Sequence, residues 1–127
     1  YARISQDIDN IRAGIDFAKA DHEWESAEAL VSYALDDTLS ERLPVSERLG
    51  LVDTALDAIE RWRNQQPEAH GTYKQKLLLE KGLALQALSQ SEASETAFRD
   101  GIAVAEMSGA TANLPAFWGN LGSLLLS

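Results

Sequence analysis

The chain has 127 residues, 45% of them apolar, and its length suits a single folded domain. The absence of cysteine excludes disulfides and thiolate metal sites and favours a reducing cytoplasm, and a net charge of -9 disfavours direct binding to nucleic acid. No apolar run reaches the roughly 18 residues that a membrane span needs. Because the first residue is Tyr1 rather than methionine, we expect a fragment of a longer protein.

Helical patterns run along the whole chain. Apolar residues recur at spacings of three and four over residues 4–20, and again from Trp24 to about Leu39, which predicts two amphipathic helices. Pro44 disfavours helical geometry for the residue before it, so a third helix is predicted over residues 45–62. Pro67 suits the first turn of a helix, and a fourth helix is predicted over residues 67–88.

Two further helices complete the pattern. Ser89 and Glu92 have the spacing of a capping box and predict the start of a fifth helix that runs to Met107, with Gly109 as its left-handed C-terminal residue. Asn113 is expected to cap a sixth helix that continues to the end of the chain. Val and Ile are sparse and no Asn-Gly or Asp-Gly turn occurs, so no strand is predicted and the fold class is all-α.

The C-terminal stretch has the order W-x-x-L-G-x-x-L, and three of its positions recur 40 residues earlier. A fixed offset indicates a helical repeat. Glycine in a helix interior costs about 1 kcal/mol relative to alanine, so Gly82 and Gly122 are expected where two helices cross closely. The later copy consists of Trp118, Leu121, Gly122 and Leu125, and the earlier one contains Leu78, Gly82 and Leu85.

This skeleton resembles helix A of a tetratricopeptide repeat. In segment 75–108, Phe98 stands at the aromatic position of helix B and Gly101 at its later small position, while Ala27 and Ala34 stand at small positions of an earlier helix B. The resemblance implies antiparallel helix pairs stacked as a right-handed α-solenoid. Within a single domain of residues 1–127, units are expected at about 8–41, 42–74 in degenerate form, 75–108 and, truncated, 115–127.

A more particular resemblance covers the N-terminal part. The run D-N-I-R-A-G-I-D-F-A over residues 9–18 and the run W-E-S-A-E-A-L over residues 24–30 resemble the start of the helical-repeat region in bacterial multidomain signal-transduction ATPases of the STAND or NB-ARC type. Gly14, His22 and Glu23 depart from that pattern. The resemblance implies a regulatory repeat segment within a larger signalling or transcription-regulatory protein.

The sequence offers no catalytic centre. It contains no Gly-rich phosphate loop, GxSxG elbow or HExxH motif. His22 and His70 are interpreted as solvated turn or surface histidines, and the acidic groups around Glu25 and Asp36 as solvated helix faces. The tryptophans are interpreted as packing residues rather than ligand-stacking ones. We therefore predict no enzyme activity, no metal ligand and no cofactor.

Two function classes remain. The first is a scaffold that binds a protein or peptide partner, or other domains of the parent protein, in the groove lined by the A helices. The second is a structural spacer or self-assembly module without a dedicated ligand. Asp16 stands where chaperone-binding repeats carry Asn, so a chaperone tail is a poor candidate. The predicted groove residues are Arg12, Asp16, Lys19, Lys76, Leu79, Leu83, Gln86, Asn120 and Ser123.

The C-terminal helix has the A-type pattern but no B helix after it. Terminal repeats need a polar outer face, whereas this helix carries Trp118, Leu121, Leu124 and Leu125. We expect an exposed apolar patch there that forms a homodimer or receives a neighbour.

Overall fold

The computed structural model describes residues 24–36, 42–64 and 67–126, apart from the side chains of residues 24–27 and 67–69. This part of the chain contains α-helices and no strand, so the all-α prediction is confirmed for it. The predicted helix over residues 4–20 lies outside the described residues. The helices are α2 (Trp24–Ala34), α4 (Val45–Trp62), α5 (Pro67–Ala87), α6 (Ser91–Ser108) and α7 (Leu114–Leu126).

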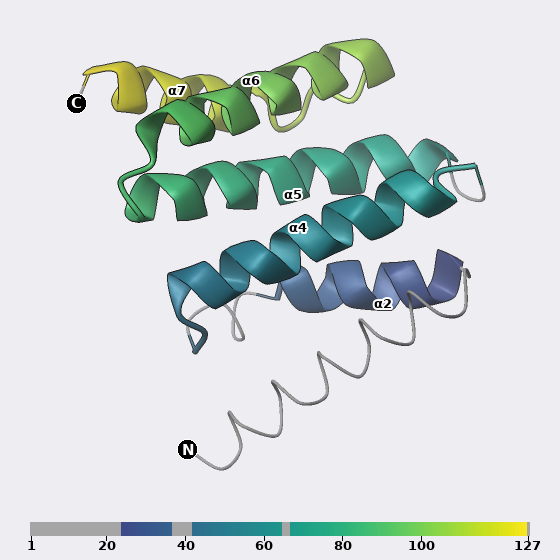
Figure 1. Ribbon diagram of the computed structural model, residues 1–127. Helices are drawn as coiled ribbons and strands as arrows, with labels where there is room; N and C mark the ends of the chain where they lie inside the picture. Colours follow the sequence, from purple (N-terminus) through teal and green to yellow (C-terminus); the bar gives the residue numbers. More distant parts are fainter. Residues whose placement is uncertain (1–23, 37–41, 65–66, 127) are drawn as a thin grey trace.

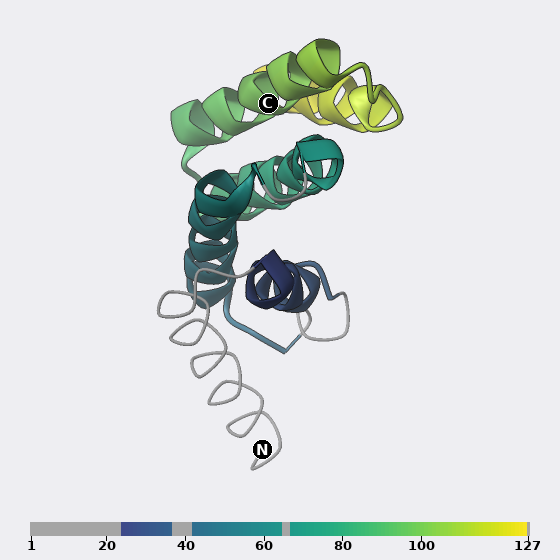
Figure 2. The same ribbon diagram turned by 90° about the vertical axis from the view of Figure 1, so that its right-hand side faces the viewer.

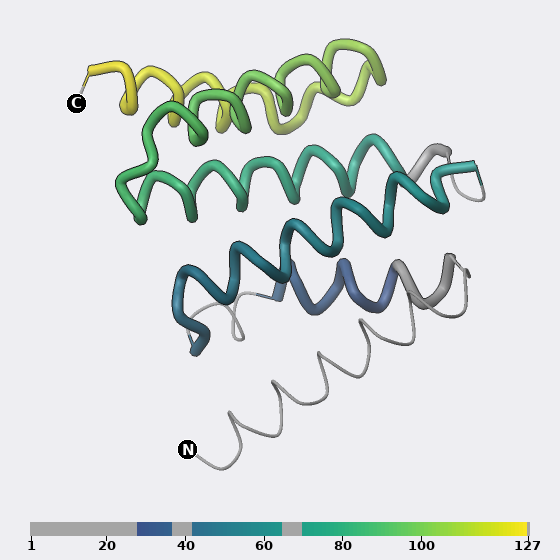
Figure 3. The backbone as a smooth tube through the Cα atoms, in the orientation of Figure 1, coloured from purple at the N-terminus to yellow at the C-terminus, as the bar shows by residue number. Residues whose placement is uncertain are grey.

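Each helix packs against the next one along the chain. The chain reverses at alternate ends of the molecule, so consecutive helices run antiparallel (Figures 1 and 3). Figure 2 shows α2 and the α6–α7 pair at opposite ends of the described part of the chain, with α4 and α5 between them. The central helix α5 also contacts both α2 and α7. The connections from α4 to α5, from α5 to α6 and from α6 to α7 contain five residues or fewer, and such short loops force sequence neighbours to be neighbours in space.

The predicted helix bounds agree with the structure at α4 and differ at the end of α2. α4 covers residues 45–62, as expected from Pro44. α2 ends at Ala34 instead of about Leu39, and its last turn tightens as the Asp36 N–H donates to the Tyr33 carbonyl at 3.3 Å. Negative charge is unfavourable at a helix C-terminus, which explains why the helix does not continue through Asp36.

The predicted unit boundary between residues 74 and 75 lies inside a helix. α5 is continuous from Pro67 to Ala87. Residues 42–74 therefore contain α4 and the first turns of α5 rather than a complete helix pair. The phasing of repeats in this part of the chain stays a prediction.

The junction between α5 and α6 differs from the predicted capping box. Ser89 has a left-handed conformation with φ 61, its N–H donates to the Gln86 carbonyl at 3.0 Å, and the Gln90 N–H donates to the Leu85 carbonyl at 2.9 Å. These bonds form a Schellman motif that ends α5. The N-cap of α6 is Gln90, without a side-chain cap bond, so the Ser89–Glu92 capping box is wrong. Gly109 is confirmed as the left-handed residue that ends α6, with φ 73.

Replacing Ser89 with glycine is expected to raise the free energy of unfolding by about 0.5–1 kcal/mol. A left-handed conformation costs a residue with a Cβ atom roughly 1 kcal/mol, and glycine escapes that cost. Urea unfolding followed by circular dichroism measures the change. Ser91→Gly is the matched control, because Ser91 is already helical and glycine should destabilise it. An unchanged or lower midpoint for Ser89→Gly would contradict the expected role of this position.

The apolar core forms two clusters along the stack. One contains buried residues of α2 and α4 together with Leu77 of α5, and the other joins α5, α6 and α7. Leu56 of α4 packs against both. The core is therefore continuous from one end of the described part to the other. The predicted packing residues Ala34, Leu78, Leu85 and Leu121 are buried in it, and the side chain of Ala27 lies outside the described residues.

Two glycines of the core receive aromatic rings from the following helix. A Cβ atom at Gly82 would lie 2.4 Å from Cε1 of Phe98, and one at Gly101 would lie 2.2 Å from Cε1 of Phe117. Both rings are fully buried. The buried Ser94 hydroxyl donates to the Gly82 carbonyl at 2.7 Å and ties α6 to α5 at the same crossing. Larger side chains at either glycine would force the helices apart.

The buried face of α7 is shifted by one residue from the face that the repeat pattern predicts. A Cβ atom at Gly122 would have no neighbour within 4 Å, so its prediction as a close-contact site is wrong. Trp118 and Leu125 are also exposed rather than packed. Phe117, not Trp118, fills the space above Gly101, and one residue turns the packing face by about 100° around the helix. The inward face of α7 carries Phe117, Leu121 and Leu124. The predicted exposed patch is therefore wrong for Leu121 and Leu124, which are buried against α6, while Trp118 and Leu125 are exposed as that prediction requires.

Candidate functional site

A surface cavity of about 340 Å³ lies where α4, α5 and α6 meet. It opens between α4 and α6, with α5 as its base. The side chains of α6 that line it are all short. The lining residues are Leu49 and Asp53 of α4, Leu78, Lys81 and Leu85 of α5, and Ala93, Thr96, Ala97 and Asp100 of α6.

The base of the cavity is apolar. Leu78 and Leu85 are seven residues apart on α5 and so lie on the same side of that helix. Both are buried, as is Ala97 on the facing side of α6. These side chains offer an incoming group little except dispersion contacts and burial of apolar surface.

The rim of the cavity is charged. The Lys81 ammonium of α5 pairs with the Asp53 carboxylate of α4 at 2.8 Å, which links the two helices and leaves Lys81 already neutralised. On the opposite side, the Thr96 hydroxyl donates to the Glu92 carbonyl at 3.1 Å. Asp100 is exposed, and no cation within residues 24–36, 42–64 and 67–126 pairs with it. The rim therefore carries one carboxylate in excess.

None of the predicted groove residues lines this cavity. Lys76, Leu79, Leu83 and Gln86 follow one another at spacings of three and four residues, along a side of α5 that faces away from Leu78 and the other cavity residues of that helix. Lys76 and Leu83 are exposed there, whereas Leu79 and Gln86 are half-buried. Whether these residues bind anything stays a prediction.

The remaining groove predictions lie at the two ends of the chain. Asn120 of α7 donates from Nδ2 to the Ala116 carbonyl at 2.8 Å, and Ser123 is exposed. Arg12, Asp16 and Lys19 lie outside the described residues. The sequence pattern missed the cavity because its walls come from three separate helices, and the periodicity of a single helix does not indicate the gap between them.

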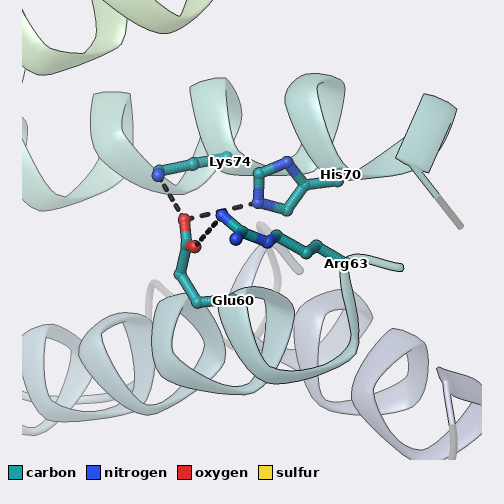
Figure 4. Close-up of polar contacts among 4 residues, drawn as sticks. All are labelled: Glu60, Arg63, His70 and Lys74. Carbon is teal, nitrogen blue, oxygen red and sulfur yellow. Dashed lines mark hydrogen bonds and ion pairs between the residues drawn. The ribbon is translucent and has the colours of Figure 1, made fainter. Parts of the chain in front are cut away.

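A second polar cluster joins the end of α4 to the start of α5 (Figure 4). The Glu60 carboxylate accepts a hydrogen bond from the Lys74 ammonium, lies 3.3 Å from His70 Nε2 and pairs with Arg63 at 3.5 Å. His70, interpreted from the sequence as a solvated turn or surface histidine, lies in α5 with a side chain that is 19% exposed and faces Glu60. The cluster ties α4 to α5 and has the character of a structural contact.

The Lys74 hydrogen bond lowers the pKa of Glu60 below its ordinary value of 4.5, against an opposing effect of burial and with further help from the charges of Lys74 and His70. A carboxyl group with a lowered folded-state pKa stabilises the fold above its unfolded pKa, and this stabilisation is lost as the pH falls through the folded value.

Glu60→Gln is expected to lower the free energy of unfolding by about 0.5–1 kcal/mol at neutral pH, as for other partly exposed ion pairs, and by less in acid below the pKa of Glu60. Urea unfolding at a series of pH values measures this. Asp57→Asn is the control, since Asp57 pairs only with Arg61 of its own helix among the described residues. Equal losses at neutral and acid pH would contradict the assigned role of Glu60.

A buried amide anchors the loop before α7. Gln75 of α5 is fully buried, its Nε2 donates to Ser108 Oγ at 3.3 Å, and its Oε1 accepts from Asn113 Nδ2 at 3.4 Å. Asn113, predicted as a helix cap, directly precedes α7 and uses its side-chain amide for this contact. The interaction fixes where the last helix begins relative to α5.

The described part of the chain was also searched for metal-binding groups and membrane-spanning helices. It holds no group of three or more His, Cys, Asp or Glu side chains that could bind a metal ion. None of its helices has the length and hydropathy of a bilayer-crossing segment. Comparisons with protein-family models, curated proteins and solved structures found no match to this chain. The resemblances to tetratricopeptide repeats and to signal-transduction ATPases therefore stay predictions.

Proposed function

We propose that this chain is a non-catalytic helical-repeat scaffold that binds a protein segment in the cavity between α4, α5 and α6, within a larger regulatory protein. The observation that carries the proposal is the cavity itself, with its apolar base and charged rim. Small-molecule pockets are typically concave and mostly apolar, with a few polar groups that orient the ligand, and a volume of about 340 Å³ lies near the lower end of their range.

The packing supports a tetratricopeptide-like solenoid. Gly82 and Phe98 are 16 residues apart, as are Gly101 and Phe117, and each pair joins consecutive helices. Repetition of one contact at one spacing is expected when similar units stack on one another. The contacts of α5 with both α2 and α7 support the same arrangement, in which alternate helices form one layer.

The charge of the rim favours a basic partner. Lys81 is neutralised by Asp53, so Asp100 is left as the uncompensated charge beside the apolar base. The net charge of -9 on the whole chain acts in the same direction, because it attracts basic segments from a distance and repels acidic ones. The partner is thus a segment with apolar side chains for Leu78 and Leu85 and a Lys or Arg that reaches Asp100.

Selection of random peptides displayed on phage, with the immobilised chain as target, tests the proposal. Enriched peptides should combine apolar residues with Lys or Arg. Their affinity should fall about tenfold or more in Ala93→Trp, where the new ring fills the cavity. Ala103→Trp is the matched control: Ala103 is also an exposed alanine of α6 but does not line the cavity.

The affinities of the selected peptides for these variants show which face of the chain binds them. Peptides that bind Ala93→Trp as well as the unchanged chain would contradict the cavity proposal. If Lys76→Ala weakens them instead, the exposed side of α5 that was predicted from the sequence is the binding face. A selection that enriches no peptide favours the alternative function, a structural spacer or self-assembly module without a dedicated ligand.

A further inference from the structure

The outer side of α7 is apolar and open. Trp118 and Leu125 are 54% and 59% exposed, and a Cβ atom at Gly119 or Gly122 would have no neighbour within 4 Å. Pro115, Trp118, Gly122 and Leu125 are three or four residues apart and lie along one side of the helix. We name these four residues the α7 stripe.

The stripe belongs to an uncharged end of a strongly charged chain. Residues 107–127 contain no acidic or basic side chain, whereas 24% of all residues are charged and the net charge is -9. Two copies that approach through other surfaces bring like charges together, which opposes association. The C-terminal end is therefore where two copies meet the least electrostatic repulsion.

The chain itself shows how a glycine and an aromatic ring fit together. Phe98 lies on Gly82 and Phe117 lies on Gly101, in each case so close that no Cβ atom could be added. The α7 stripe carries both halves of such a contact one helical turn apart: the exposed ring of Trp118 and the open backbone at Gly122. A helix with a ring and a matching gap on one side is complementary to an antiparallel copy of itself.

We infer that the α7 stripe binds a second copy of this chain. When two α7 helices run antiparallel about a two-fold axis, Trp118 lies on the partner's Gly122, and Gly122 receives the partner's Trp118. The same alignment sets Pro115 opposite the partner's Leu125. Every contact along the stripe is then apolar and reciprocal, and none of them uses the cavity.

The contact is short, so the dimer is weak. A helix of 13 residues spans about 20 Å, and two such stripes bury less than the roughly 800 Å² per partner of stable complexes. Sedimentation equilibrium should show an average mass that rises from 13.9 kDa toward twice that value. The rise is expected between about 10 μM and about 1 mM chain.

Three variants test the pairing. Trp118→Gly removes the ring and Gly122→Trp fills the gap, so each should keep the mass at the monomer value. The double variant exchanges ring and gap at positions that face each other across the axis, and it should restore the dimer. Gly50→Trp is the matched control, because Gly50 is exposed on α4 with no atom within 4 Å of a Cβ position. It should dimerise as the unchanged chain does.

Several results would overturn the inference. One is a chain that stays strictly monomeric up to about 1 mM. A dimer with a Kd above that concentration would be too weak to count as a specific contact. The others are a dimer that survives both single substitutions, which would use another surface, and a double variant that stays monomeric. Circular dichroism of each variant confirms that the helices are intact. All of these results leave the cavity proposal unaffected, because no stripe residue lines the cavity.

Discussion

Gly82→Ala is expected to lower the free energy of unfolding by about 1–3 kcal/mol, although alanine is the better helix former. The added Cβ atom would lie 2.4 Å from Cε1 of Phe98, a ring that is fully buried and has no free space to move into. The crossing between α5 and α6 must widen, and the contacts around it are lost. Urea unfolding followed by circular dichroism measures the effect.

Gly50→Ala is the matched control for this substitution. Gly50 lies in the interior of α4, and a Cβ atom there would have no neighbour within 4 Å. Alanine at this position should raise the free energy of unfolding by about 0.5–1 kcal/mol. If both substitutions stabilise the chain, α5 and α6 do not cross at Gly82 as described, and the packing of that half of the molecule is wrong.

Phe98→Ala is expected to lower the free energy of unfolding by about 3–5 kcal/mol, the largest effect of any single substitution considered. Phe98 is fully buried in the cluster that joins α5, α6 and α7, and its loss leaves a cavity next to Gly82. Unfolding in urea measures the loss. Met107→Ala serves as the control on the same helix, because Met107 is 89% exposed and its truncation should change stability by less than about 0.5 kcal/mol.

The two sites should be energetically coupled. Phe98→Leu withdraws ring atoms from Gly82, so the cost of Gly82→Ala should be smaller in the Phe98→Leu background than in the unchanged chain. Residues in direct contact commonly show coupling of about 0.5–3 kcal/mol. Strictly additive losses would mean that the ring does not lie on the glycine.

Local signals predicted the helices well where one residue type dictates the backbone. Pro44 marks the start of α4, and Gly109 has the left-handed conformation that ends α6. Ser89 shows the limit of this reasoning: it has a left-handed conformation that glycine usually takes, and its Ser-x-x-Glu spacing pointed to a different motif. The backbone bonds of a Schellman motif involve no side chain, so the sequence carries little trace of them.

The packing face of α7 shows a second limit. Phe117 and Trp118 are adjacent aromatic residues about 100° apart around the helix, and periodicity alone favours neither as the buried one. The structure places Phe117, not Trp118, on Gly101 of α6. Periodicity within one helix also does not predict the cavity or the Glu60 cluster, because both depend on side chains from different helices that come together in the fold.

The most direct test of the cavity as a binding site is an amide chemical-shift titration of the isotope-labelled chain with a peptide enriched in the phage selection. We predict that the largest shifts map to the cavity walls, at Lys81 on α5 and at Thr96, Ala97 and Asp100 on α6. Shifts centred on Lys76 and Leu83, or on α7, with the cavity residues unchanged, would contradict the proposal.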